Sequence, residues 1–243
     1  MWWTNLFKDM SSTSFFNFSF LPAYTGYFLQ GMAYTLLLAV VSVALAVIPA
    51  LLLALMRLSK KKAIQCVSGA YIAVFRSTPL LVQLSIIYFG LFTAISIPRI
   101  TIWGFVDLSR FIPGVVALAL NSSAYVAEIF RAGILAVDKG QTEAARSLGL
   151  SSWQSMRLVV LPQAIKNVLP ALANEVVTMV KESSICSMLG MAELMFVSKT
   201  VATGTYITLA PYTIAALIYF CINYPASKAI EAIERRMRRG DKQ

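Results

Sequence analysis

The chain has 243 residues, of which 58% are hydrophobic and 13% are charged, and its formal net charge is +10. Soluble domains carry about 25% charged residues, so this composition excludes an ordinary soluble domain and favours a membrane protein. The sequence has no histidine, no Gly-Lys-Ser/Thr phosphate loop and no G-x-G pair, which excludes imidazole catalysis and the common nucleotide-binding motifs. The three cysteines are far apart and lack metal-ligand spacing. No catalytic residues, metal or bound cofactor are therefore expected, and any work must draw on an ion gradient or another protein.

Residues 1–27 are predicted to form an external, interfacial arm, because their Trp and Phe rings favour the boundary between membrane and water. No charge occurs between Asp9 and Arg57. A helix needs about 20 apolar residues to cross the hydrocarbon core, so the first membrane span is predicted near 28–56.

The second span is predicted near 68–94, within another stretch that has no charge after Arg76. Pro79 lacks a backbone N–H and is expected to break or kink this helix. Broken helices expose free backbone groups at substrate sites, so Thr78, Leu80 and Gln83 are candidate substrate contacts. A purely structural kink is the alternative.

The third span is predicted near 111–133. Asn121 lies in the middle of this span and is expected either to line a substrate path or to bond between helices. Glu128 and Arg131 are one helical turn apart and are expected to form an ion pair near the cytoplasmic end.

Residues 138–161 are predicted to form two short helices joined by a sharp turn. Gly149 is expected to end the first helix in the left-handed conformation, and Ser151 with Gln154 forms a capping-box pattern at the start of the second. Trp153, Met156, Val159 and Val160 are expected on one helical face. The residues alone leave open whether this pair docks into a partner or packs on its own chain.

Two further spans are predicted near 167–190 and 206–227, followed by a basic tail of residues 228–243. The fourth span is the weakest because it contains charged residues, and such groups usually face a cavity or a partner. Glu182, with Ser183 beside it, is expected to meet an ammonium group, or else Glu182 pairs with Lys181. The fold class is therefore an all-α membrane protein of about five transmembrane helices within residues 28–227.

The distribution of cations predicts the topology. The arm and the loops 95–110 and 191–205 hold four Lys and Arg residues, whereas the loops 57–62 and 131–166 and the tail hold fifteen. Because Lys and Arg accumulate on the cytoplasmic side, the N-terminus is predicted outside and the C-terminus inside. The net charge then reflects topology and contact with the lipid bilayer, and no nucleic acid is expected.

The stretch "EAARSLGLSSWQSMRLVVLPQAI", residues 143–165, resembles the EAA motif of the membrane subunits of ATP-binding cassette (ABC) importers. The similarity extends to "YIAVFRSTPLLVQLSIIYFG", "NSSAYVAEIFRAGILAVDKGQTEAARSLGL" and "NEVVTMVKESSICSMLG", which resemble the polar amino acid uptake branch of that family. It runs from about residue 31 to the tail.

The resemblance implies the type I importer permease fold in a bacterial plasma (inner) membrane. It implies that the 138–161 loop is a coupling element that docks in a cleft of a separate ATPase. The contact residues it implies are Glu143, Ala144, Ala145, Gly149 and Leu150.

The implied partners are a dimer of cytoplasmic ABC ATPase subunits, which hold the ATP and Mg, a second permease that is identical or homologous, and an extracytoplasmic substrate-binding protein. The implied substrate is a polar amino acid, and the chain itself is not an enzyme. The alternative is a gradient-driven amino acid carrier or channel, which gives the 138–161 loop no role.

Overall fold

The computed structural model describes residues 17–95 and 97–239, and this part of the chain is almost entirely helical. Its longer helices are α2 (Leu21–Arg57), α3 (Lys62–Ser77), α5 (Leu108–Leu135), α8 (Leu161–Glu182), α9 (Leu194–Thr205) and α10 (Ala210–Arg239). Its shorter helical pieces are α4 (Leu80–Ser85), η1 (Ile86–Leu91), α6 (Lys139–Ser147), α7 (Ser152–Ser155), η2 (Met156–Val160) and η3 (Ser183–Leu189). A short antiparallel hairpin of β1 (Thr101–Ile102) and β2 (Val106–Asp107) precedes α5. The predicted all-α class is confirmed.

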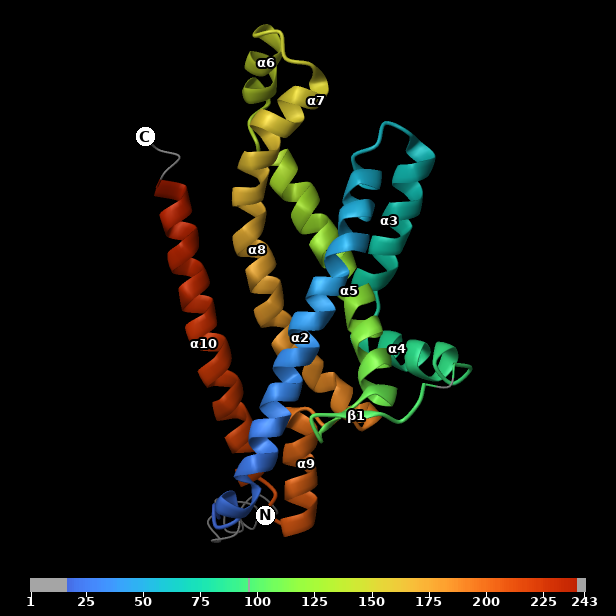
Figure 1. The fold of residues 1–243 in the computed structure, drawn as a ribbon, viewed down its shortest axis with the longest axis vertical. Helices are drawn as coiled ribbons and strands as arrows, with labels where there is room; N and C mark the ends of the chain where they lie inside the picture. Colours follow the sequence, from blue (N-terminus) through green and yellow to red (C-terminus); the bar gives the residue numbers. More distant parts are fainter. Residues whose placement is uncertain (1–16, 96, 240–243) are drawn as a thin grey trace, which may run out of the picture.

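Figure 1 shows an elongated bundle whose two ends carry different elements. The connection between α2 and α3, the α6–α7 pair and the C-terminal end of α10 lie at one end, which we call the α6 end. The start of α2, the β1–β2 hairpin and α9 lie toward the other end, which we call the α9 end. The segments predicted to be cytoplasmic therefore share one end of the molecule. Which side of the membrane each end faces stays a prediction.

Small residues let the central helices approach one another closely. Ala50 of α2 is buried together with Ala124 and Ala127 of α5. At Gly133 of α5, an added Cβ would lie only 2.4 Å from Cγ2 of Val168 on α8. Helices in membranes associate mainly through such close packing, because lipid is as apolar as the side chains.

Pro79 breaks the second helix, as its position in the sequence predicts. α3 ends at Ser77, Thr78 and Pro79 are extended, and the following α4–η1 segment is turned by 107° relative to α3. The predicted span 68–94 is therefore not one straight helix. Proline restricts the residue before it to extended backbone, and α4 and η1 consequently turn sideways from the bundle (Figure 1).

Within the described residues, α2 and α5 are the helices that are each long and apolar enough to cross a membrane. The number rises to four if the bent pairs α3 with α4–η1, and α7–η3 with α9, each count as one span. The segment predicted as the fifth span lies in α10, which is not among these helices. That segment includes Pro211, Asn223 and Pro225, which lower its hydropathy. The number and limits of the spans stay a prediction.

The helices at both ends of the chain are longer than the predicted spans. α2 begins at Leu21, inside the predicted arm, and the part of the arm before residue 17 lies outside the described residues. α10 continues through the predicted tail to Arg239, and residues 240–243 lie outside the described residues.

Candidate functional site

The α6–α7 pair forms the predicted helix–turn–helix. Asp138 caps α6 by accepting a hydrogen bond from the backbone N of Gly140 at 2.6 Å. Gly149 has a φ of +85°, so the left-handed turn expected at this position is confirmed. Both bonds of the predicted capping box are present: the Gln154 N–H donates to Ser151 Oγ, and the Ser151 N–H donates to Gln154 Oε1. These short-range signals define the turn.

The surface of this pair differs from the predicted one. Glu143, Ala144 and Gly149 are exposed and Leu150 is half-buried, but Ala145 is only 4% exposed. Ala145 was expected on the docking surface. It instead packs inward, because it lies on the face of α6 that turns toward the neighbouring helical segments, and it accepts a hydrogen bond from the Leu150 N–H.

Two large apolar residues protrude from the pair. Leu148 is 84% exposed and Trp153 is 70% exposed. Most of the helical face that was predicted to carry four apolar residues is open to the surroundings. Trp153 and Met156 are exposed, Val159 is half-buried, and Val160 is buried. Trp153 was not predicted as a docking residue. An aromatic side chain next to a helix cap could have indicated this role, because Trp is enriched among the residues that dominate binding at interfaces. The pair is therefore an exposed, partly apolar knob at the α6 end (Figure 1).

The knob is continuous with a long helix. α7, η2 and α8 follow one another without a gap from Ser152 to Glu182, which amounts to about 46 Å of helix. Gln163 of α8 donates to Gln141 Oε1 of α6 at 3.3 Å, and Arg146 of α6 donates to Ser152 Oγ of α7 at 2.9 Å. The knob is therefore joined both along the chain and by side-chain hydrogen bonds to a helix that reaches the middle of the bundle.

The structure brings three of the predicted substrate-path residues together at the break after α3. The Gln83 side-chain amide donates to the Phe75 and Thr78 carbonyl oxygens and to Thr78 Oγ1, at 2.8 to 2.9 Å. Asn121 of α5 donates to Gln83 Oε1 at 2.8 Å. Gln83 and Asn121 are buried, so their amides satisfy the carbonyl groups that Pro79 leaves without helical partners. The arrangement supports the structural alternative for both residues, and Leu80 is half-buried beside them.

The polar residues of α8 point in different directions. Glu175 is buried and accepts a hydrogen bond from Ser122 of α5 at 2.8 Å. Ser183 is buried, and its hydroxyl donates to the Val180 carbonyl at 2.9 Å. Glu182 is half-buried, whereas Lys181 lines a cavity next to α10. The contact between Glu182 and substrate therefore stays a prediction, and Ser183 uses its hydroxyl within the chain.

A charged cluster lies on α5 and its neighbours. Arg131 donates to Glu128 at 2.8 Å, which confirms the predicted ion pair. Arg57 of α2 adds a second cation 3.8 Å from Glu128. The Arg76 guanidinium lies 5.5 Å from the centre of the Tyr125 ring, within the range of a cation–π interaction.

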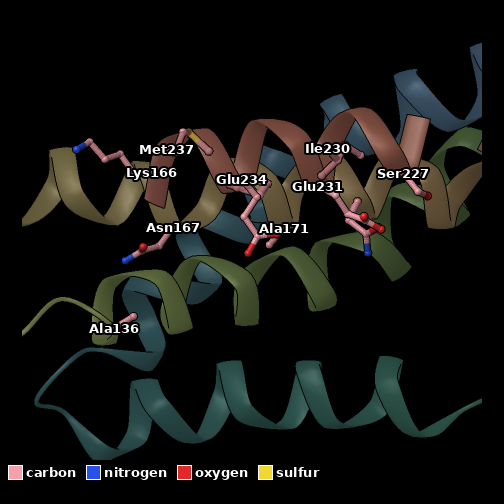
Figure 2. Close-up of a pocket in the computed structure, with 11 residues that line it drawn as sticks. Ala136, Lys166, Asn167, Ala171, Ser227, Ile230, Glu231, Glu234 and Met237 are labelled. Atoms are coloured by element: carbon pink, nitrogen blue, oxygen red, sulfur yellow. The ribbon is translucent and has the colours of Figure 1, made fainter. Parts of the chain in front are cut away.

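A cavity of about 460 Å³ lies between α8 and α10 near the end of α5. Figure 2 shows Glu231 and Glu234 reaching from α10 into this space, opposite Asn167 and Ala171 of α8. A second, shallower surface depression lies along the same two helices and is lined by Lys181 and Asn223 among others. No motif in the sequence indicates this interface.

A buried carboxylate lies where three helices meet at the α9 end. Glu193 is 0% exposed and caps α9 by accepting from the Met195 and Phe196 N–H groups at 2.8 and 2.6 Å. Tyr219 of α10 donates its hydroxyl to Glu193 Oε2 at 3.0 Å. The next backbone N–H, of Leu194, donates to Thr35 of α2 at 3.1 Å. Sequence reasoning missed this cluster, because its residues are far apart along the chain.

Known proteins resemble this chain in fold and in sequence. The pattern of the family described as binding-protein-dependent transport system inner membrane component matches residues 42–239. The chain therefore belongs to this family of membrane permease components.

Individual relatives match nearly the whole chain. The chain is 40% identical over 215 residues to the arginine transport system permease protein ArtQ of Bacillus subtilis, covering 88% of this chain and 94% of that protein. It is 40% identical over 211 residues to a putative glutamine transport system permease protein GlnP of Rickettsia typhi, covering 87% and 93%. A crystal structure of an amino acid ABC transporter with histidines matches with a TM-score of 0.81 at 47% identity, covering 90% of this chain and 98% of that chain.

Proposed function

We propose that the chain is the membrane permease of an ATP-driven importer for polar amino acids, and that the α6–α7 knob couples it to a separate ATPase. The observation that carries the proposal is the knob itself. It exposes Leu148 and Trp153 at the α6 end, and it continues without interruption into α8. Exposed apolar anchors of this kind suit insertion of a helix into a groove on a partner.

The proposed complex has two permease subunits, two cytoplasmic ATPase subunits that bind ATP and Mg, and an extracytoplasmic binding protein. The α6 end faces the cytoplasm, and the α9 end receives the substrate. The family relatives support a polar amino acid as substrate, because their names refer to arginine and glutamine transport systems.

Cysteine labelling tests the proposed orientation and docking together. In a variant whose exposed Cys66 and Cys221 are replaced by serine, Leu148→Cys in the knob should react with an impermeant maleimide only from the cytoplasmic side, and addition of the ATPase subunit should protect it. Thr203→Cys, exposed on α9, is the matched control and should react only from outside. Labelling of Leu148→Cys from outside in intact cells would contradict the orientation, and labelling unaffected by the ATPase would contradict the docking.

A further inference from the structure

A shallow depression on the surface between α2, α3 and α5 is lined by charged side chains. Arg57 of α2, Glu128 of α5, and Arg76 and Ser77 of α3 line it, together with Ala73 and other residues of α3. Arg76, Ser77 and Ala73 are exposed, so a ligand can reach them from outside the bundle. We call this surface the arginine depression.

Helix geometry brings the two arginines of the depression toward each other. α2 ends and α3 begins at the α6 end, so these helices run in opposite directions (Figure 1). Long side chains on a helix point back toward its N-terminus, so Arg57 points away from the α6 end and Arg76 points toward it. Accordingly, Nη1 of Arg57 lies only 3.0 Å from the position that a Cβ of Gly69, within α3, would occupy.

The cations around the depression outnumber the carboxylates. Arg131 pairs with Glu128 at 2.8 Å, and Arg57 lies 3.8 Å from the same carboxylate. Arg76 forms no ion pair with the described residues, and its guanidinium lies against the ring of Tyr125, one helical turn before Glu128 on α5. Three guanidinium groups therefore share one carboxylate, which leaves an excess of two positive charges. Charged groups in membrane proteins usually face an opposite charge, so the depression suits an anion.

The depression lies at the expected depth of lipid head groups. The predicted first span, 28–56, is about 43 Å long as a helix. A bilayer that includes its head groups is about 40–45 Å thick. Arg57 directly follows this span and is therefore expected at the head-group layer of the cytoplasmic leaflet, where anionic lipids are concentrated.

The surroundings of the depression favour a phospholipid over a free anion. Guanidinium groups bind phosphate oxygens through paired hydrogen bonds. Exposed apolar side chains flank the charged groups on the same two helices, namely Leu52 and Leu55 of α2 and Val67 and Val74 of α3. A phospholipid has acyl chains for these side chains as well as a phosphate for the arginines, whereas an inorganic phosphate ion has only the second.

We propose that the arginine depression binds the phosphate of an anionic phospholipid of the cytoplasmic leaflet, with Arg57, Arg76 and Ser77 as donors. The bound lipid offsets the excess positive charge beside Glu128 and connects α2, α3 and α5 at one site. The inference uses the predicted orientation of the chain and does not depend on which solute the chain transports.

The test uses the complete importer in a neutral detergent, with Cys66 and Cys221 replaced by serine. Ala73→Cys introduces a thiol into the depression. Val74→Cys is the matched control, because Val74 is exposed at the next position of α3 and does not line the depression. The rate of labelling by an uncharged maleimide is measured while short-chain phosphatidylglycerol, phosphatidylcholine with the same chains, or inorganic phosphate is added.

Phosphatidylglycerol should slow the labelling of Ala73→Cys but not of Val74→Cys, and the other two compounds should protect Ala73→Cys much less. Loss of one basic residue at an anionic surface weakens binding by about fivefold, so Arg76→Gln should raise the half-protecting concentration by about that factor. Arg76→Lys keeps the charge and should keep most of the affinity. Lys60→Gln, which removes an exposed cation that does not line the depression, should have a much smaller effect.

Equal weakening by Lys60→Gln and Arg76→Gln would overturn the inference, because binding would then reflect diffuse attraction to the basic end of the chain. Equal protection by phosphatidylcholine, or of both thiols, would overturn it as well. Equal protection by inorganic phosphate would show a free-anion site and refute the assignment to a lipid. If Arg76→Gln fails to assemble, Ser77→Asp provides the second variant, since it adds a carboxylate at an exposed position of the depression. Unchanged protection in Ser77→Asp would refute the site.

Discussion

Gly149→Val should uncouple the importer without unfolding it. Gly149 has a φ of +85°, and an added Cβ would meet nothing within 4 Å. The cost of the substitution is therefore conformational strain alone, about 1–2 kcal/mol for a residue with a Cβ in the left-handed region. A difference of this size changes the population of a conformation by a factor of about 5 to 30. The turn between α6 and α7 should consequently open, and Leu148 and Trp153 should no longer be held in one arrangement.

The assay compares membrane insertion, uptake and ATP hydrolysis in three variants. Gly149→Val should insert normally and lose most ATP-driven uptake, with hydrolysis no longer responsive to substrate delivery. Gly149→Asn should retain most uptake, since asparagine tolerates the left-handed conformation. Gly204→Val is the matched control, because Gly204 is also open to solvent but has an ordinary helical φ. Parental uptake in Gly149→Val, or equal loss in Gly149→Asn and Gly149→Val, would refute the role of the turn.

Three further predictions follow from individual contacts. Ala145→Leu should destabilise the protein by about 1–3 kcal/mol because it overpacks a buried position. Ala144→Leu, on the exposed face, should leave the melting temperature unchanged and lower the affinity for the ATPase. Equal melting temperatures of the two variants would contradict the burial of Ala145. Gln83→Leu should lower the free energy of unfolding by about 1–3 kcal/mol because it leaves buried polar groups unpaired. Glu182→Gln should lower uptake without changing the free energy of unfolding. Normal uptake in Glu182→Gln would mean that this carboxylate does not contact the substrate. Tyr219→Phe should lower the melting temperature because the buried carboxylate at the start of α9 loses a donor, and an unchanged melting temperature would show that α10 does not depend on that bond.

Short-range sequence signals predicted the features that depend on a few neighbouring residues. The cap of Ser151 with Gln154, the left-handed Gly149 and the break at Pro79 each follow from the conformational preferences of one or two residues. The ion pair of Glu128 and Arg131 was predictable for the same reason, because helical geometry alone brings its members together.

Features that depend on tertiary packing were not predictable in the same way. Gln83 and Asn121 both looked like candidate substrate contacts, but their mutual hydrogen bond spans 38 positions of the chain. Only the packing of α4 on α5 shows that each satisfies the other. Ala145 likewise looked equivalent to Ala144 in the sequence, and its burial depends on how α6 packs against its neighbours. The cavity between α8 and α10 likewise depends on the relative position of two helices, which periodicity does not specify.

We infer that this chain transports solute only when a separate ATPase acts on it through the α6–α7 knob. Uptake of radiolabelled arginine, glutamine and histidine into proteoliposomes tests it most directly, with the ATPase subunit present or absent and with ionophores that abolish ion gradients. We expect uptake that requires both ATP and the ATPase subunit and that persists when all gradients are abolished. Uptake by the permease without the ATPase, driven by an imposed ion gradient and stopped by the ionophores, would contradict it.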